Sequence, residues 1–124
     1  MIVTKYEEAP KFPAPPPSAK YSKILIDPEI GSKHVAVGIA VYPIGEKGKP
    51  HTHTGEETII IIKGKAKISN GTKKYILNPL DTAYIPPGEL HSLENAGNEE
   101  LMFIWIYTPP GDERKIRARA KTQK

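Results

Sequence analysis

The chain has 124 residues and no cysteine, which excludes disulfides, zinc–thiolate sites and cysteine nucleophiles. This length suits one compact domain with a core of modest size. The formal net charge is +4, but residues 112–124 hold six basic and two acidic side chains. The first 111 residues therefore carry 12 basic and 12 acidic residues and are neutral, so the basic excess belongs to a C-terminal tail.

We take residues 111–124 as this basic tail, for which two interpretations compete. Such a tail can be an arm that binds nucleic acid or a membrane surface. It can also be a solvated or briefly helical end that favours solubility. No aromatic residue is interleaved with its charges, as single-stranded nucleic acid binding would require. We therefore expect the second role and no nucleic-acid or membrane partner.

The N-terminal residues 1–20 form a proline-rich arm in our interpretation. Five of the 13 prolines lie in residues 9–17, which favours extended polyproline geometry. The arm is then either loose or laid on a neighbouring subunit. The first residues lack the basic flank and apolar run of a signal peptide, and the longest apolar run is too short to span a membrane. We expect a cytoplasmic protein, and the abundance of lysine and isoleucine indicates a thermophilic source.

Between these ends, residues 21–110 alternate short apolar runs with turn signals. Residues 65–69 end at Asn70-Gly71, a strong signal for a β-hairpin because both turn residues tolerate positive φ. Regularly spaced short strands without a helical stretch are typical of an all-β sandwich or barrel. The predicted strands are residues 24–26, 35–41, 58–62, 65–69, 75–77, 83–85 and 101–107.

Two of these runs are apolar on both faces of the strand. They are residues 59–62 and the run LMFIWIY at 101–107, where Phe103, Trp105 and Tyr107 share one parity and the residues between them the other. One set fills the barrel. The opposite face then needs a cover, which predicts a homodimer.

The stretch PHTHTGEE predicts half of a metal site. His51 and His53 point to the same side of a strand, and Glu57 has the same parity if the strand resumes after Gly55. A third histidine, His91, follows the turn Pro-Pro-Gly at residues 86–88. Three imidazoles and one carboxylate suit one divalent ion of iron, manganese, nickel, copper, cobalt or zinc, with two coordination positions open.

These residues also resemble the motifs of the cupins. Gly45, His51, His53, Glu57 and Gly64 match the first motif, G-x5-H-x-H-x3-E-x6-G, in every gap. Pro86, Gly88, His91 and Asn95 match the second, G-x5-P-x-G-x2-H-x3-N, whose opening glycine is replaced by Leu80. The resemblance implies a jelly-roll barrel, or double-stranded β-helix, with His51, His53, Glu57 and His91 holding the metal. It further implies a dimer in which the N-terminal segment packs on or is exchanged with the partner.

The cupin fold does not fix a function, so the activity depends on residues near the metal. Few acids or bases are placed to face the barrel, which favours chemistry done by the metal itself. We expect a metal-dependent oxygenase, decarboxylase or isomerase acting on a small oxygenated molecule, with Tyr84 and Glu89 as candidate catalytic substrate contacts. The alternatives are a non-catalytic module that binds a sugar or carboxylate, and a structural protein tied by its metal.

Overall fold

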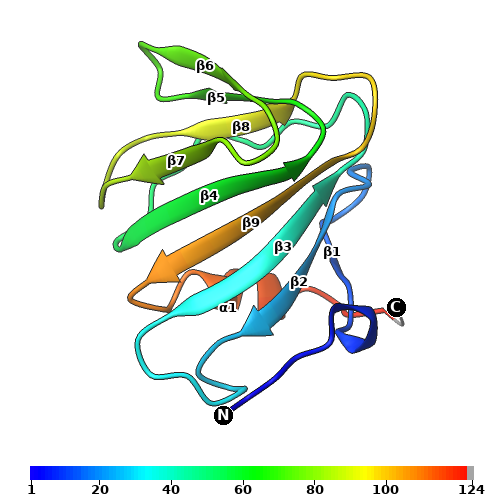
Figure 1. The fold of residues 1–124 in the computed structure, drawn as a ribbon, viewed down its shortest axis with the longest axis vertical. Coiled ribbons are helices and arrows are strands. Elements are labelled where there is room, and N and C mark those ends of the chain that lie inside the picture. The colour runs from blue at the N-terminus through cyan, green and yellow to red at the C-terminus, as the bar shows by residue number, and fades with distance from the viewer. Residues whose placement is uncertain (123–124) are drawn as a thin grey trace.

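The computed structural model describes residues 1–122, which form two antiparallel sheets facing one another (Figure 1). The large sheet has the strand order β1-β2-β3-β9-β4-β7, and the small sheet the order β6-β5-β8. The strands are β1 (Phe12–Pro13), β2 (Tyr21–Ile26), β3 (Ala36–Tyr42), β4 (Glu56–Lys63), β5 (Ala66–Ser69), β6 (Lys74–Leu77), β7 (Thr82–Ile85), β8 (Ser92–Asn95) and β9 (Leu101–Thr108). Two short helices, η1 (Tyr6–Glu8) and α1 (Glu113–Arg117), lie near the chain ends. The predicted all-β barrel is confirmed.

All seven predicted strands are present, and the structure adds β1 and β8. β8 escaped prediction because its sequence SLEN contains a single apolar residue. Its alternation is nevertheless regular, since Leu93 and Asn95 are buried while Ser92 and Glu94 are partly exposed. The strand pairs with β5 and thereby completes the small sheet.

The predicted hairpin joins β5 and β6, but its turn differs from the expected one. Within the turn only Gly71 has a positive φ, of 96°. Asn70 instead accepts hydrogen bonds through Oδ1 from the backbone N–H groups of Thr72 and Lys73, at 3.1 and 2.8 Å. A side-chain acceptor therefore closes a loop longer than the two-residue turn that Asn-Gly favours.

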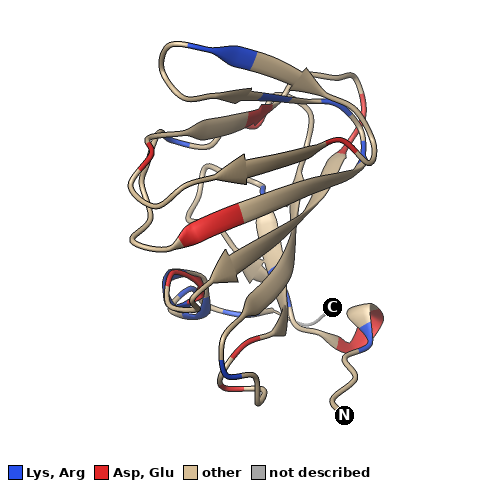
Figure 2. Cartoon of the chain, turned by 60° about the vertical axis from the view of Figure 1, so that its left-hand side comes forward, with Lys and Arg blue, Asp and Glu red and all other residues tan. Residues whose placement is uncertain are grey.

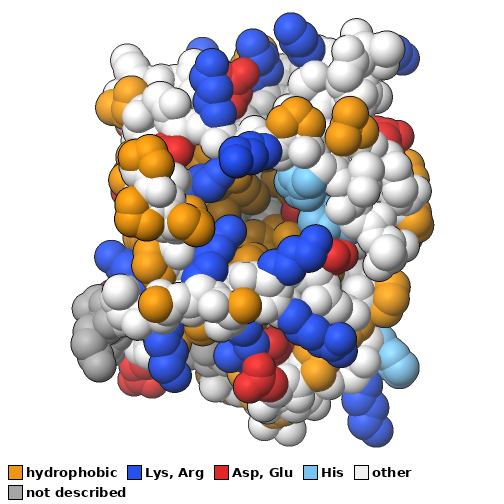
Figure 3. Space-filling view, turned by 180° about the vertical axis from the view of Figure 1, so that it is seen from behind, with side chains coloured by type: hydrophobic (Ala, Val, Ile, Leu, Met, Phe, Trp, Pro, Cys, Tyr) orange, Lys and Arg blue, Asp and Glu red, His pale blue; other side chains and the backbone are white. Residues whose placement is uncertain are grey.

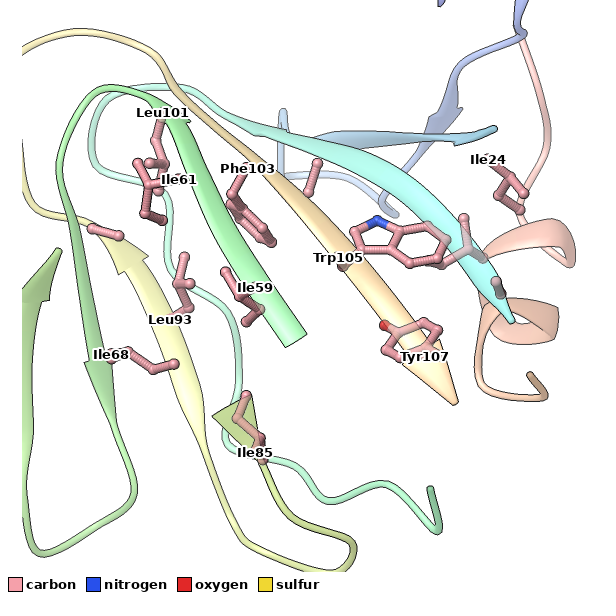
Figure 4. Packing of buried hydrophobic residues seen from close by; sticks show 14 of the residues in the cluster. Ile24, Ile59, Ile61, Ile68, Ile85, Leu93, Leu101, Phe103, Trp105 and Tyr107 are labelled. Atoms are coloured by element: carbon pink, nitrogen blue, oxygen red, sulfur yellow. The ribbon is translucent and has the colours of Figure 1, made fainter. Parts of the chain in front are cut away.

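The core lies between the two sheets and is built from inward-facing positions of the strands. Phe103, Trp105 and Tyr107 on β9 are buried and point into this space (Figure 4). Trp105 packs directly on Gly38 of β3, where a Cβ atom would overlap its ring. Figure 2 shows that most of the strand ribbon carries no charge, and that charged residues gather in loops, short helices and strand ends. Alternate burial along the strands thus separates core from solvent.

The N-terminal arm packs on its own chain and is not loose. Phe12 is buried at 4% exposure, and β1 pairs with β2 at the edge of the large sheet. Lys23 donates from Nζ to the Tyr6 carbonyl at 2.8 Å and lies over the Tyr6 ring. An edge strand tolerates proline because one side of the strand needs no ladder hydrogen bonds.

The C-terminal tail holds a brief helix, one of the two forms expected for it, and that helix is anchored to the barrel. Ile116 of α1 is buried, and Arg117 donates to both carboxylate oxygens of Asp27 at 2.6 and 2.7 Å. Thr122 pairs with Lys11 of the N-terminal arm through two backbone hydrogen bonds. Lys124 lies outside the described residues. Among residues 1–122, no helix has the length and apolar character needed to cross a membrane.

Candidate metal centre

The two histidine segments are joined by backbone hydrogen bonds. His51 and His91 exchange N–H to carbonyl bonds, both 3.0 Å long. The N–H of Gly88 donates to the His53 carbonyl at 2.8 Å, and Gly88 adopts φ of 79°, a conformation that glycine takes without strain. The Pro-Pro-Gly turn therefore folds the third histidine onto the extended segment before β4 that carries the first two.

The structure brings the four predicted residues His51, His53, Glu57 and His91 into one cluster. One ligand atom from each lies within 4.8 Å of the others. Nε2 of His51 is 3.2 Å from Nε2 of His53, and Oε1 of Glu57 is 3.0 and 3.1 Å from Nε2 of His53 and His91. His53, Glu57 and His91 are buried, whereas His51 is exposed.

Backbone carbonyls set the orientation of two of the imidazoles. Nδ1 of His51 is 2.8 Å from the Lys49 carbonyl, and Nδ1 of His91 is 2.9 Å from the Glu89 carbonyl. A carbonyl oxygen only accepts, so Nδ1 carries the hydrogen in both residues. In the neutral rings the Nε2 lone pairs then face the cluster, as metal ligation requires.

The electrostatics of the cluster also fit a bound cation. Burial raises the pKa of the Glu57 carboxyl, but the hydrogen bonds from His53 and His91 outweigh burial, and the pKa falls below its ordinary value. Burial lowers the pKa of His51, which favours its neutral form. Burial also opposes protonation of His91, but Glu57 raises its pKa above the ordinary value. Converging imidazole nitrogens beside a carboxylate are stabilised when they share a metal ion or a proton.

The structure does not bring Tyr84 to the cluster. In the β4–β7 register Glu57 pairs with Ile85, so Ile85 faces inward and Tyr84 outward. The Tyr84 side chain is exposed, and its hydroxyl donates to Glu56 at 2.8 Å. The parity of β7, which is set by its pairing with β4, therefore separates Tyr84 from the cluster. That Tyr84 contacts substrate stays a prediction.

Glu89 and Asn95 lie nearer to the cluster. The Glu89 carbonyl holds His91, and its carboxylate helps to raise the pKa of His91 after the larger effects of burial and Glu57. Asn95 is buried and donates from Nδ2 to the carbonyls of Tyr42 and Glu99, both at 2.9 Å. Asn95 therefore holds backbone segments together, and the candidate metal ligands are the three histidines and Glu57.

Asp112 is a site residue that the sequence did not reveal. Its Oδ2 lies 3.3 Å from Nδ1 of His53, although the two atoms are not aligned as a hydrogen bond. His53 thus has a carboxylate near its Nδ1, whereas Nδ1 of His51 and of His91 is hydrogen-bonded to a backbone carbonyl. Asp112 comes from the basic tail 59 residues downstream, and no local spacing links it to His53.

A hollow opens beside the cluster. Figure 3 shows its apolar floor, histidine side chains on one wall and lysine and arginine side chains around the opening. Tyr107 contacts His53 with ring centroids 5.0 Å apart, and Tyr42 packs edge-on against Phe103. Burial, followed by the charge of Glu57, raises the pKa of Tyr42 to about 12 and that of Tyr107 well above its ordinary value. Both hydroxyls therefore remain protonated.

The cupin domain family model matches residues 38–107, and the chain belongs to this family. A cupin-like protein from Thermotoga maritima is 30% identical in sequence, with a TM-score of 0.69 over 74% of this chain and 70% of that one. A second structure from the same organism, described as a predicted oxalate decarboxylase, is 24% identical, with a TM-score of 0.74 over 89% and 100% of the two chains.

Among curated proteins, an uncharacterised protein from Methanocaldococcus jannaschii is 36% identical over 72 residues, or 57% of this chain and 58% of that protein. The mannose-1-phosphate guanylyltransferase RfbM of Salmonella typhimurium is 33% identical over 86% of this chain, which spans 22% of its length. The chain therefore spans less than two thirds of both relatives.

Proposed function

We propose that this cupin is a metal-dependent enzyme of the oxygenase, decarboxylase or isomerase kind that acts on a small oxygen-rich molecule. The observation that carries the proposal is the convergence of three imidazole Nε2 atoms and Glu57 Oε1 on one point beside an open hollow. Iron, manganese, nickel, copper, cobalt or zinc suits this donor set. When bound, such an ion supplies Lewis-acid chemistry or activation of dioxygen.

The protein groups around the cluster have supporting tasks. Tyr42 and Tyr107 stay protonated and can donate hydrogen bonds to substrate oxygens. The indole N–H of Trp105 is buried and has no hydrogen-bond partner within residues 1–122. Leaving such a donor unpaired costs about 1–3 kcal/mol. Glu89 beside His91 remains a proposed substrate contact.

A non-catalytic function is the second candidate. A cupin that binds a sugar or a carboxylate without turnover would use the same hollow and the same donors. The relatives leave both functions open, because they include a protein named beta-D-galactosidase from Mycobacterium tuberculosis and auxin-binding protein 1 of Arabidopsis thaliana. A set of four protein ligands favours the enzyme, since it leaves positions open on an ion that takes six, and binding alone does not require open positions.

Elemental analysis of the purified, tag-free protein tests the proposal. About one transition-metal ion per chain is expected, lost in His51→Ala and His91→Ala. His34→Ala is the matched control, because His34 is exposed and lies outside the cluster. Absence of metal from the native protein, together with failure to take it up on reconstitution, contradicts the proposal. Turnover that needs the metal separates the enzyme from the binding module.

We also propose a homodimer that buries the outer face of the large sheet. Ile104 of β9 lies between Ile39 of β3 and Ile60 of β4, and all three side chains are half-exposed. A contiguous apolar patch of this kind is typical of an interface. Sedimentation velocity would give the mass of a dimer, and Ile104→Lys would yield the monomer. The cytoplasmic location and thermophilic source stay predictions.

A further inference from the structure

Three cationic side chains, Lys20, Lys49 and Arg119, lie close enough together for the charges of Arg119 and Lys49 to act on Lys20 after the larger effects of burial and Glu46, and we call them the rim cations. Figure 3 shows lysine and arginine side chains surrounding the hollow that holds the histidines. The rim cations come from three separate segments: the end of the N-terminal arm, the loop before His51 and the C-terminal tail. Their assembly at one opening is therefore a product of the tertiary structure.

Lys20 is held at the opening by specific contacts. Its Nζ donates to the Lys47 carbonyl at 3.1 Å and lies 5.2 Å from the centroid of the Tyr42 ring. The neighbouring carboxylate, Glu46, accepts hydrogen bonds from Ser18 Oγ at 3.2 Å and from the Ala19 N–H at 2.6 Å. Glu46 thus fixes the backbone that leads to Lys20.

Lys49 directly precedes the histidine segment, and the charge of Arg119 acts on Tyr42, whose ring lies under Lys20. The Lys49 carbonyl holds the imidazole of His51, so its residue borders the cluster. Burial and then Glu57 raise the pKa of Tyr107, and the positive charge of Arg119 opposes this rise. Arg119 opposes the same rise at Tyr42. The charge of Arg119 thus supports the geometric placement of Lys20 over Tyr42 as one side of a cationic opening.

The rim cations repel one another and are not neutralised by ion pairs. Burial lowers the pKa of Lys20, and the charges of Arg119 and Lys49 lower it further against the opposing effect of Glu46. None of the three forms an ion pair in the part of the chain that the structure describes. Uncompensated like charges around a concave site attract ligands of the opposite charge.

We propose that the rim cations bind an anionic group, a carboxylate or a phosphate, on a small oxygen-rich ligand whose other end reaches the metal centre. This inference rests on the proposed function and adds the charge of the ligand to it. Arg119 offers a planar pair of donors that matches both anions, and the lysines add point charges. A metal held by the histidines would add positive charge on one wall of the hollow, and a neutral ligand would leave the charge of the rim cations unpaired.

The test uses three probes with one sugar ring: glucose, glucuronate and glucose 6-phosphate. They differ at carbon 6, which is neutral in the first and carries a carboxylate or a phosphate in the others. Dissociation constants are measured by calorimetry on the full chain, with and without reconstituted metal, at low and high salt. The variants are Lys49→Gln, Arg119→Gln and their double substitution, and Lys74→Gln on the exposed strand β6 is the charge-matched control.

At least one anionic probe should bind about tenfold more tightly than glucose, as expected for charge-assisted hydrogen bonds. Each rim substitution should lower that affinity about tenfold and weaken its salt dependence, while Lys74→Gln leaves it unchanged. The better anionic probe distinguishes carboxylate from phosphate recognition. Equal binding of all three sugars, no binding, or indifference to the rim substitutions overturns the inference. Metal content measured on the same samples tests the proposed function separately, because anion preference is also measured without metal.

Discussion

Asp112 is expected to strengthen metal binding by orienting His53. Nδ1 of His51 and of His91 each face a backbone carbonyl that no substitution removes. Nδ1 of His53 instead faces the Asp112 carboxylate at 3.3 Å, and that side chain is 16% exposed. Asp112→Ala therefore removes the acceptor behind one of the four ligands and leaves the ligands themselves in place.

The expected loss follows from this geometry. Removing the acceptor behind a ligating histidine weakens metal binding about 10–100-fold, or about 1.4–2.8 kcal/mol. Asp112→Asn keeps a carbonyl oxygen at the same place and should lose less. Asp112 makes no side-chain hydrogen bond to the first turn of α1, so loss of a helix cap adds nothing to the effect.

The assay is competition for the metal against a chelator of known affinity, with the melting temperature of the metal-free protein measured in parallel. Glu8→Ala removes an exposed carboxylate on η1 and serves as the charge control. We expect weaker metal binding in Asp112→Ala with a melting temperature close to that of the parent. Metal affinity within twofold of the parent would refute the orienting role. A fall in affinity that merely follows a fall in stability would also refute it.

Two further predictions concern stability. Leu80 occupies the position of the motif glycine, with φ of 75°, and its side chain is 79% exposed. Glycine relieves the left-handed strain but loses more backbone entropy on folding. Leu80→Gly should therefore raise the free energy of unfolding by about 0.5–1 kcal/mol and raise the melting temperature. Unchanged or lower stability would contradict this. Arg117→Ala should cost about 2–4 kcal/mol in urea titrations at pH 7, because Asp27 is left buried and charged. The Arg117 hydrogen bond outweighs burial and lowers the pKa of Asp27 below its ordinary 3.8, so this stabilisation is present above about pH 4 and is lost as pH falls through the folded-state value. A difference in the free energy of unfolding between the parent and Arg117→Ala that stays constant as the pH falls would refute this role of Arg117.

The sequence by itself determined the candidate ligands. Residues two apart in an extended segment share a face, and His51 and His53 do point together, although both precede β4 and only His51 forms a bridge, with His91. The turn at residues 86–88 then returned His91 to the same place through three backbone hydrogen bonds. Leu80 shows how far such local rules reach, because the turn conformation is kept there without the glycine.

The same local rules predicted most of the strands and the two faces of β9. Phe103, Trp105 and Tyr107 share one parity and proved to be the buried set. Local rules could not decide which face of β7 points inward, because no neighbour of Tyr84 in the sequence fixes the side to which its side chain points. Pairing of Ile85 with Glu57 made that choice, and Tyr84 was placed outside.

Only the tertiary structure decided what surrounds the site. Asp112 and Arg119 reach the barrel because Ile116 is buried and Arg117 pairs with Asp27, 90 residues earlier in the chain. A basic tail with this composition can equally be solvated. The spacing of residues within the tail carries no information about the Asp27 carboxylate, which lies far away in the sequence. The contacts around the metal centre thus depend on long-range burial and charge pairing. Its ligands, by contrast, could be predicted from residue type and short-range spacing.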